Sequence, residues 1–188
     1  LLAASAAESH GRSAYSLAGL VDAVTEAEAS EAGATRLARG IGRARAIVVL
    51  GRGYEYATAL EAALKIKELA RVWAEPYSSA DFAHGPIALL EPRLPVLLFA
   101  AGGMAARRGV RALCRTLRAK GVALFAVTND DAVAELADDA LVLRSPLPEA
   151  LIPISFAVAA QHLAVALARR HGRDVERPHG LSKVTRTR

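Results

Sequence analysis

One segment, residues 57–70, places two carboxylates and an amine at helical spacing, as Glu61, Lys65 and Glu68. Its residues are nearly all good helix formers and include no Gly or Pro, so we predict a helix. At ~100° per residue, the three polar side chains fall within roughly 60° of one another. An apolar stripe lies beside them, formed by Leu60, Ala63 and Leu64. The spacing therefore predicts a polar seam that need not face bulk water.

A carboxylate and an ammonium group in a dry site can move a proton and stabilise the negative charge that this creates. Glu68 is the candidate base, and burial would raise its pKa toward neutrality. Lys65 is the candidate cation for an oxygen that gains charge, with Glu61 orienting it. A competing interpretation is an ion pair on the helix surface between Glu61 and Lys65 at i, i+4, with Glu68 nearby, stabilising by only about 0.2–0.5 kcal/mol.

The elements that must position these residues alternate between apolar β-type runs and helical patterns. Because the strands have few polar positions, we expect a parallel sheet covered on both faces, in a three-layer αβα sandwich. The five expected strands are residues 46–50, 72–75, 96–100, 122–128 and 140–143, and the helices between or after them are 57–70, 105–120, 131–137 and 149–171. The turn Gly51-Arg52-Gly53 joins the first strand to the first of these helices.

Three regions make up the chain in this interpretation. Residues 1–44 form a helical linker, with helices over 1–10, 16–29 and 31–41, that ends a preceding domain. Residues 45–171 form the sheet domain, and residues 172–188 form a basic tail. The chain begins without Met, in what reads as the last turns of a helix, so we expect a piece of a longer protein. Residues 151–168 are long and apolar, but Pro153, Ser155, Gln161 and His162 interrupt them, which favours a core or interface helix over a membrane span.

Composition argues against several classes of partner. The net charge is +5 with a pI near 9.8, yet the basic residues spread along helix faces, and the chain has only one Trp, four Tyr and four Phe. We therefore expect no nucleic acid and no membrane as partners, and an anionic ligand would suit the positive field. The one cysteine, Cys114, excludes an intrachain disulfide and fits a cytoplasmic protein.

The motifs GRG…LEAALKIKE…AEPYSSADFAHGP, over 51–86, resemble the second sugar isomerase (SIS) domain of the glutamine–fructose-6-phosphate aminotransferase family. They are equally similar to the related amino sugar phosphate deaminases. The resemblance runs from about residue 46 to the final motif PHGLSKVT. It implies a flavodoxin-like domain that isomerises a hexose 6-phosphate between C1 and C2, such as fructose 6-phosphate or glucosamine 6-phosphate. It also implies that this domain is part of an aminotransferase or deaminase.

The resemblance also implies roles for individual residues. Glu68 matches the glutamate that moves the proton, and His84 matches a histidine that opens the sugar ring from a neighbouring subunit, which implies a homodimer. Lys183 matches the tail lysine that closes over the sugar, as an oxyanion partner or as a Schiff base, and Ser182 beside it is a candidate substrate contact. Glu61 and Lys65 complete the expected substrate-binding set.

One part of the family pattern is missing. No Ser-x-Ser-Gly-x-Thr run, which would cradle the phosphate, and no glutaminase segment occur in this chain. We therefore expect the chain alone to show no appreciable isomerase activity and to bind sugar phosphate weakly. Neither a metal nor an organic cofactor is expected.

Two alternatives remain open. The first is a dinucleotide fold, because Gly51-Arg52-Gly53 follows a strand and Glu75 lies where a ribose-binding acid could stand. Tyr56, however, occupies the position of the third glycine. The second is a non-catalytic SIS module that senses sugar phosphates, which would require loss of the catalytic set. Glu68, His84 and Lys183 are all present.

Overall fold

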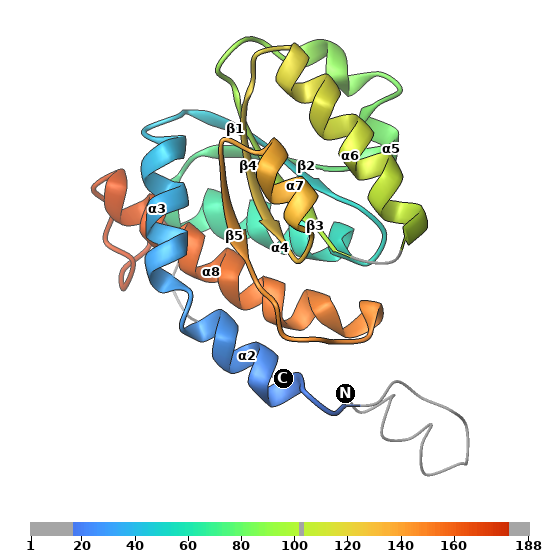
Figure 1. The fold of residues 1–188 in the computed structure, drawn as a ribbon. Helices are drawn as coiled ribbons and strands as arrows, with labels where there is room; N and C mark the ends of the chain where they lie inside the picture. Colours follow the sequence, from blue (N-terminus) through green and yellow to red (C-terminus); the bar gives the residue numbers. More distant parts are fainter. Residues whose placement is uncertain (1–16, 102–103, 181–188) are drawn as a thin grey trace, which may run out of the picture.

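A five-stranded parallel sheet forms the centre of the computed structural model, which describes residues 17–101 and 104–180, with the backbone alone at 104–107 (Figure 1). The strands lie in the order β2-β1-β3-β4-β5 and every neighbouring pair is parallel. Their bounds are Ala46–Gly51 for β1, Trp73–Ser78 for β2, Pro95–Ala100 for β3, Ala123–Thr128 for β4 and Asp139–Val142 for β5. All five expected strands are therefore confirmed, with ends displaced by at most a few residues.

Helices cover both faces of this sheet. One face carries α2 (Leu20–Glu28), α3 (Glu31–Ile41), α4 (Glu55–Lys65) and α8 (Ile152–Arg170), and the other carries α5 (Ser79–Phe82), α6 (Met104–Ala119) and α7 (Asp131–Leu136) (Figure 1). Short 3-10 turns occur at Pro86–Leu89 and Glu149–Leu151. The expected three-layer αβα sandwich is thus confirmed, and its strand order is that of flavodoxin-like sheets.

Each central strand buries its side chains on both faces in alternation. In β1, Ile47 and Val49 pack under α3, α4 and α8, whereas Val48 and Leu50 pack under α6 and α7. The strands β3 and β4 alternate in the same way. The sheet therefore has a hydrophobic core on each face. Burial on both faces explains why the strands are continuous apolar runs in the sequence.

The stretch Glu149–Arg170, which joins the last 3-10 turn to α8, is the only described helical stretch with the length and apolar composition to cross a membrane. Its buried side chains, such as Phe156 and Leu163, belong to the core that α2, α3 and α4 share. Core helices of globular proteins have the same composition, and α8 occupies such a place in this fold.

The helices that precede the sheet differ in part from expectation. Residues 31–41 are helical as expected, but the helix expected over 16–29 begins only at Leu20, and residues 1–10 lie outside the described part of the chain. Leu37 and Ile41 of α3 are buried in the same core as α8. Helix α3 therefore completes the sheet domain, while the end of a preceding domain in this region stays a prediction.

The long helix after β1 also differs from expectation. It begins at Glu55 rather than at residue 57, and its last five residues, Ile66–Ala70, form a π-helix. Ile66 and Ala70 are both fully buried against α8, and Arg71 ends the element in the left-handed conformation, with φ 57°. The α-helical pattern could not predict this change, because the wider turn satisfies packing between helices rather than local propensity.

Close backbone packing fixes the turn between β1 and α4. A Cβ on Gly51 would lie 2.2 Å from the carbonyl oxygen of Glu55, so no larger residue fits there without moving the backbone. Gly53 has φ +60° and open space around it. A side chain would therefore fit at this position, and glycine is favoured there only because of the backbone conformation. The tight strand-to-helix turn predicted from the two glycines is confirmed.

Candidate active site

Lys65 and Glu68 form the centre of the candidate site, at the junction of α4 with the π-helix. The Lys65 ammonium donates a hydrogen bond of 2.8 Å to Glu68 Oε2. Glu61 lies one turn earlier on α4, and its Oε1 accepts a hydrogen bond of 3.5 Å from the Gln161 amide of α8. The three residues that the spacing predicted as one seam therefore do share one side of the helix.

The charges of this seam reinforce one another. The hydrogen bond and charge of Glu68, together with the charge of Glu61, raise the pKa of the Lys65 ammonium, although partial burial opposes this. Lys65 therefore remains a cation at neutral pH. A cation at this position can stabilise negative charge that develops on a ligand oxygen.

Within this chain the seam is more open than the sequence suggested. The side chains of Lys65 and Glu68 are 31% and 30% exposed, and Leu60 and Leu64 of the expected apolar stripe are 45% and 44% exposed. Only Ala63 of that stripe is buried. The described residues therefore leave this face of α4 uncovered, and they do not provide the dry environment expected for Glu68.

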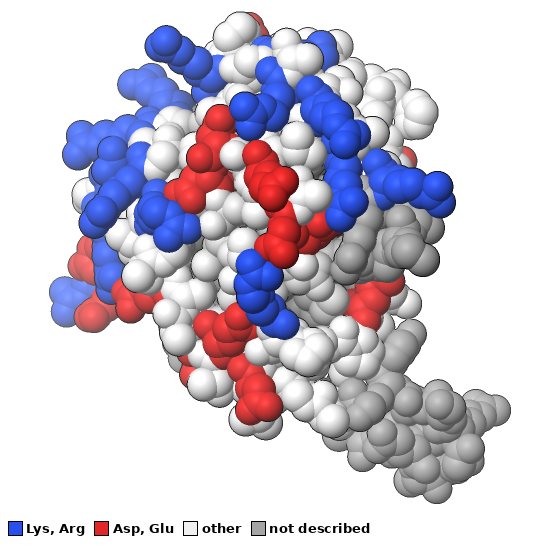
Figure 2. All heavy atoms as spheres, in the orientation of Figure 1, with Lys and Arg blue, Asp and Glu red and all other residues white. Residues whose placement is uncertain are grey.

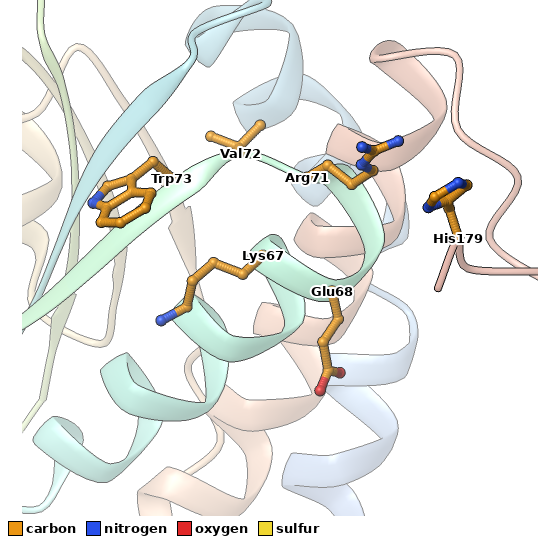
Figure 3. Close-up of a pocket in the computed structure, with 6 residues that line it drawn as sticks. All are labelled: Lys67, Glu68, Arg71, Val72, Trp73 and His179. Carbon is orange, nitrogen blue, oxygen red and sulfur yellow. The ribbon is translucent and has the colours of Figure 1, made fainter. Parts of the chain in front are cut away.

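Glu68 also lines a surface depression of ≈ 470 Å³ at the amino end of β2. Figure 3 shows Arg71 and His179 at one end of this depression and Lys67 and Trp73 at the other, with Glu68 extending from the turn between them. An acid, several cationic or titratable groups and an aromatic ring therefore surround one hollow that is large enough for a small ligand.

His84 lies at the opposite end of β2 from Glu68. The chain enters β2 after Glu68, runs through six strand residues, and reaches exposed His84 only after α5. At ~3.3 Å per residue, the strand alone separates the two regions by roughly 17 Å. One βαβ unit thus does not bring the histidine to the carboxylates of the same chain.

The tail candidates Ser182 and Lys183 lie outside the described residues. His179, three residues before Ser182, lines the depression beside Glu68. Sequence reasoning assigned no role to His179, Arg71 or Trp73. The first stands inside the tail motif, which was the available signal, while the other two meet Glu68 only because the π-helix turns directly into β2.

A metal site has no support among the described residues. No three His, Cys, Asp or Glu side chains within residues 17–101 and 104–180 cluster in a way that could hold a metal ion.

Known proteins share this fold and much of this sequence. The model of the SIS domain family matches residues 40–169, which span the sheet from before β1 to the end of α8. A structure entitled the C-terminal domain of glucosamine–fructose-6-phosphate aminotransferase, from Francisella tularensis, superposes with a TM-score of 0.74. It is 26% identical and matches 83% of this chain and 44% of its own.

Curated relatives point the same way. The isomerizing glutamine–fructose-6-phosphate aminotransferase of Zymomonas mobilis is 34% identical over 149 residues, which are 78% of this chain and 24% of that protein. The protein of the same name from Thermosynechococcus vestitus is 38% identical over 137 residues, which are 72% and 22% of the two chains. The chain thus spans about a quarter of the length of these relatives. With a family match over most of its residues, the chain belongs to the SIS domain family.

Proposed function

We propose that this chain supplies the proton-transfer residues for aldose–ketose isomerisation of a hexose 6-phosphate, within a protein that adds or removes an amino group at C2. The contact that carries this proposal is the 2.8 Å bond between Lys65 and Glu68, on one seam with Glu61 and beside a ligand-sized depression. Names of the matched relatives, which are isomerizing aminotransferases, support the substrate class.

In the proposed step, the Glu68 carboxylate takes the proton from C1 or C2 of the open-chain sugar, and the carbon's electron pair forms the enediolate double bond. Glu68 then returns the proton to the adjacent carbon, so the same group acts as base and as acid. Lys65 stabilises the enediolate oxygen while the negative charge resides there. Glu61 acts as a positioning residue, because its charge attracts the Lys65 ammonium from one turn earlier on the helix.

Neighbouring parts of the protein complete the proposed site. His84, at the far end of β2, acts on the sugar bound by the other subunit of a homodimer, where it opens the ring. Ser182 and Lys183 close over the sugar from the tail, and the place of His179 beside Glu68 supports a tail that returns to this depression. Because Leu60 and Leu64 are exposed beside the seam, a further domain or subunit would supply the dry wall that proton transfer needs.

We also propose a cytoplasmic location. The only cysteine, Cys114, is fully buried and unpaired, and burial raises the pKa of its thiol to about 11. A chain that folds with a free thiol and needs no disulfide suits a reducing compartment.

Glu68→Gln in the complete protein tests the proposal. The amide keeps the shape of the side chain and can still accept a hydrogen bond from Lys65, but it cannot take up a proton. We expect kcat for interconversion of the hexose 6-phosphates to fall about 10²–10⁴-fold while KM changes less than about threefold. Glu135→Gln, an exposed substitution of the same kind on α7, serves as the matched control. Near-normal turnover in the Glu68 variant would remove Glu68 from the mechanism and leave a sensor module as the better function.

A further inference from the structure

A second hollow, the cationic groove, lies at the amino end of the sheet. It encloses ≈ 510 Å³ and is lined by Arg43, Arg45, Arg71, Val72, His171 and Arg173. The arginines come from three separate parts of the fold: the loop before β1, the residue between the π-helix and β2, and the segment after α8. Figure 2 shows Lys and Arg side chains gathered on the side of the molecule where α3 and the end of α8 lie.

The groove arginines share the lack of a carboxylate partner with several other described arginines, but here four of them line one hollow. Within residues 17–101 and 104–180, none of the four guanidinium groups that line the groove forms an ion pair with a carboxylate. Arg43 donates to the carbonyl oxygen of Arg170 at 3.2 Å, which leaves its charge uncompensated. Elsewhere, arginines do pair with acids: Arg36 with Asp139, Arg111 with Asp130, Arg144 with Asp131, and Arg169 with Glu31.

The acidic residue nearest in sequence to Arg173 already accepts hydrogen bonds from other groups. Asp174 directly follows Arg173, but its Oδ1 accepts hydrogen bonds from the backbone N–H groups of Glu176 and Arg177, at 3.0 and 3.3 Å. The carboxylate thus serves the turn of its own segment. Among the residues that the structure describes, no acidic side chain lines the groove, so the described lining is cationic.

His171 gives a second, independent indication of a ligand. Its Nε2 atom is buried and has no hydrogen-bond partner among the described residues, and other atoms of the residue line the groove. Burial lowers the pKa of its imidazole, and the charges of Arg173, Arg43 and Arg170 lower it further. A neutral imidazole beside several guanidinium groups is a donor or acceptor that the described residues leave unused, and an anion could take its N–H.

The ends of helices explain only some of the arginines on this side of the molecule. Arg39, Arg169 and Arg170 stand in the last turns of α3 and α8, where cations offset the helix dipole. Arg45 instead precedes a strand, and Arg71 is held at φ 57°, a conformation that favours glycine over a residue with a side chain. The fold thus places a guanidinium at Arg71 against the conformational preference of that position.

We propose that the cationic groove binds a small anion that carries two or more phosphoryl groups. Guanidinium forks bind phosphoryl oxygens in pairs, and four of them along one groove suit an anion with more than one phosphoryl group. The volume falls in the range of small-molecule sites rather than that of an extended polyanion track. The groove shares Arg71 and Val72 with the depression beside Glu68, but this proposal does not rest on the proposed isomerase activity.

Calorimetric titration of the complete protein with inorganic pyrophosphate tests the site, at a fixed ionic strength of about 0.1 M. We expect saturable binding with one pyrophosphate per chain, and inorganic phosphate at least about 10-fold weaker because it engages fewer guanidinium groups. The imidazole protons of His171 should shift in the NMR spectrum as pyrophosphate is added. No saturable binding below about 1 mM, or equal affinity for phosphate and pyrophosphate, would overturn the proposal.

Variants locate the site. The double variant Arg45→Gln with Arg173→Gln removes two groove charges and should weaken pyrophosphate binding at least about 10-fold. The matched control, Arg115→Gln with Lys120→Gln, removes two exposed charges at the other face of the sheet and should change affinity less than about twofold. Equal losses in both variants would mean that net charge alone attracts the anion. A single-stranded oligonucleotide that binds tighter than pyrophosphate, with a stoichiometry that depends on its length, would instead assign the groove to nucleic acid.

Discussion

Glu55 offers a direct test of how the fold treats a buried charge. It stands in the first turn of α4 with only 2% of its surface exposed, and its Oε1 atom is buried without a hydrogen-bond partner. Oε2 accepts a hydrogen bond of 2.7 Å from the Thr58 hydroxyl, which only partly offsets the loss of water. Burial, reinforced by the nearby charge of Glu149, raises the pKa of Glu55 from 4.5 to about 7.

This shift has a definite sign. Below pH 4.5 the carboxyl group is protonated in the folded and the unfolded chain, and its ionisation costs no stability. Between 4.5 and about 7 the unfolded chain has released the proton while the folded chain still holds it, so stability falls as the pH rises. At about 1.4 kcal/mol per pH unit, the full loss above that range is about 3 kcal/mol.

Glu55→Gln should remove this loss, because the amide resembles the protonated carboxyl group and never ionises. We expect the variant and the parent chain to be similar in stability at about pH 4.5, and the variant to be more stable by about 3 kcal/mol at about pH 8. With a urea m-value of about 2 kcal/mol/M, the unfolding midpoint of the variant moves up by about 1.5 M at the higher pH.

Urea unfolding followed by circular dichroism at several pH values measures this difference. Titration of all other groups cancels in the comparison between variant and parent. Glu135→Gln, at an exposed position on α7, should give a difference that does not vary with pH. A stability difference for Glu55→Gln that is likewise flat between about pH 4.5 and 8 would show that the folded chain tolerates the charge, and the reasoning from burial would be wrong.

Three further outcomes follow from local packing. Gly51→Ala should destabilise the fold by about 3 kcal/mol because its Cβ meets the backbone of Glu55, whereas Gly53→Ala should cost about 1 kcal/mol from its positive φ alone; urea midpoints that fall equally would contradict this. Asp130→Ala should cost about 3 kcal/mol, since this buried carboxylate holds Arg111 at 2.7 Å and caps α7, and a loss below about 1 kcal/mol would refute that role. Cys114 should not react with a thiol reagent at about pH 8 until the chain unfolds, because burial raises its pKa to about 11; rapid labelling of the folded chain would disprove this.

The fold could be predicted from the sequence because its strands are apolar on both faces. Runs such as the one around Val49 and Leu50 leave few assignments other than buried parallel strands, and the alternating helices then determine the layers. The π-helix could not be predicted in this way. Its residues Ile66 and Ala70 are buried against α8, which begins more than eighty residues later. Local propensity carries no information about such a partner.

The candidate site divides in the same way. That Lys65 and Glu68 share one side of the helix followed from helical spacing alone, although the ion pair expected between Glu61 and Lys65 forms instead between Lys65 and Glu68. The exposure of Leu64 and the separation of His84 from Glu68 depend on what covers α4 and on the direction of β2. The cationic groove could not be predicted from the sequence because its arginines, at positions 43, 45, 71 and 173, come together only once the sheet has formed.

The residues of the two cores on opposite faces of the sheet are completed at different times during translation. The core under α6 and α7 draws its buried residues from 48–133, so a ribosome has made all of them before α8 is translated. The opposite core joins residues as early as Ala27 to residues as late as Ala168, and it stays open until the last helix emerges. A nascent chain that stalls before α8 would therefore expose one whole apolar face of its sheet. Until α8 is translated, the chain has the largest apolar surface for a chaperone to cover.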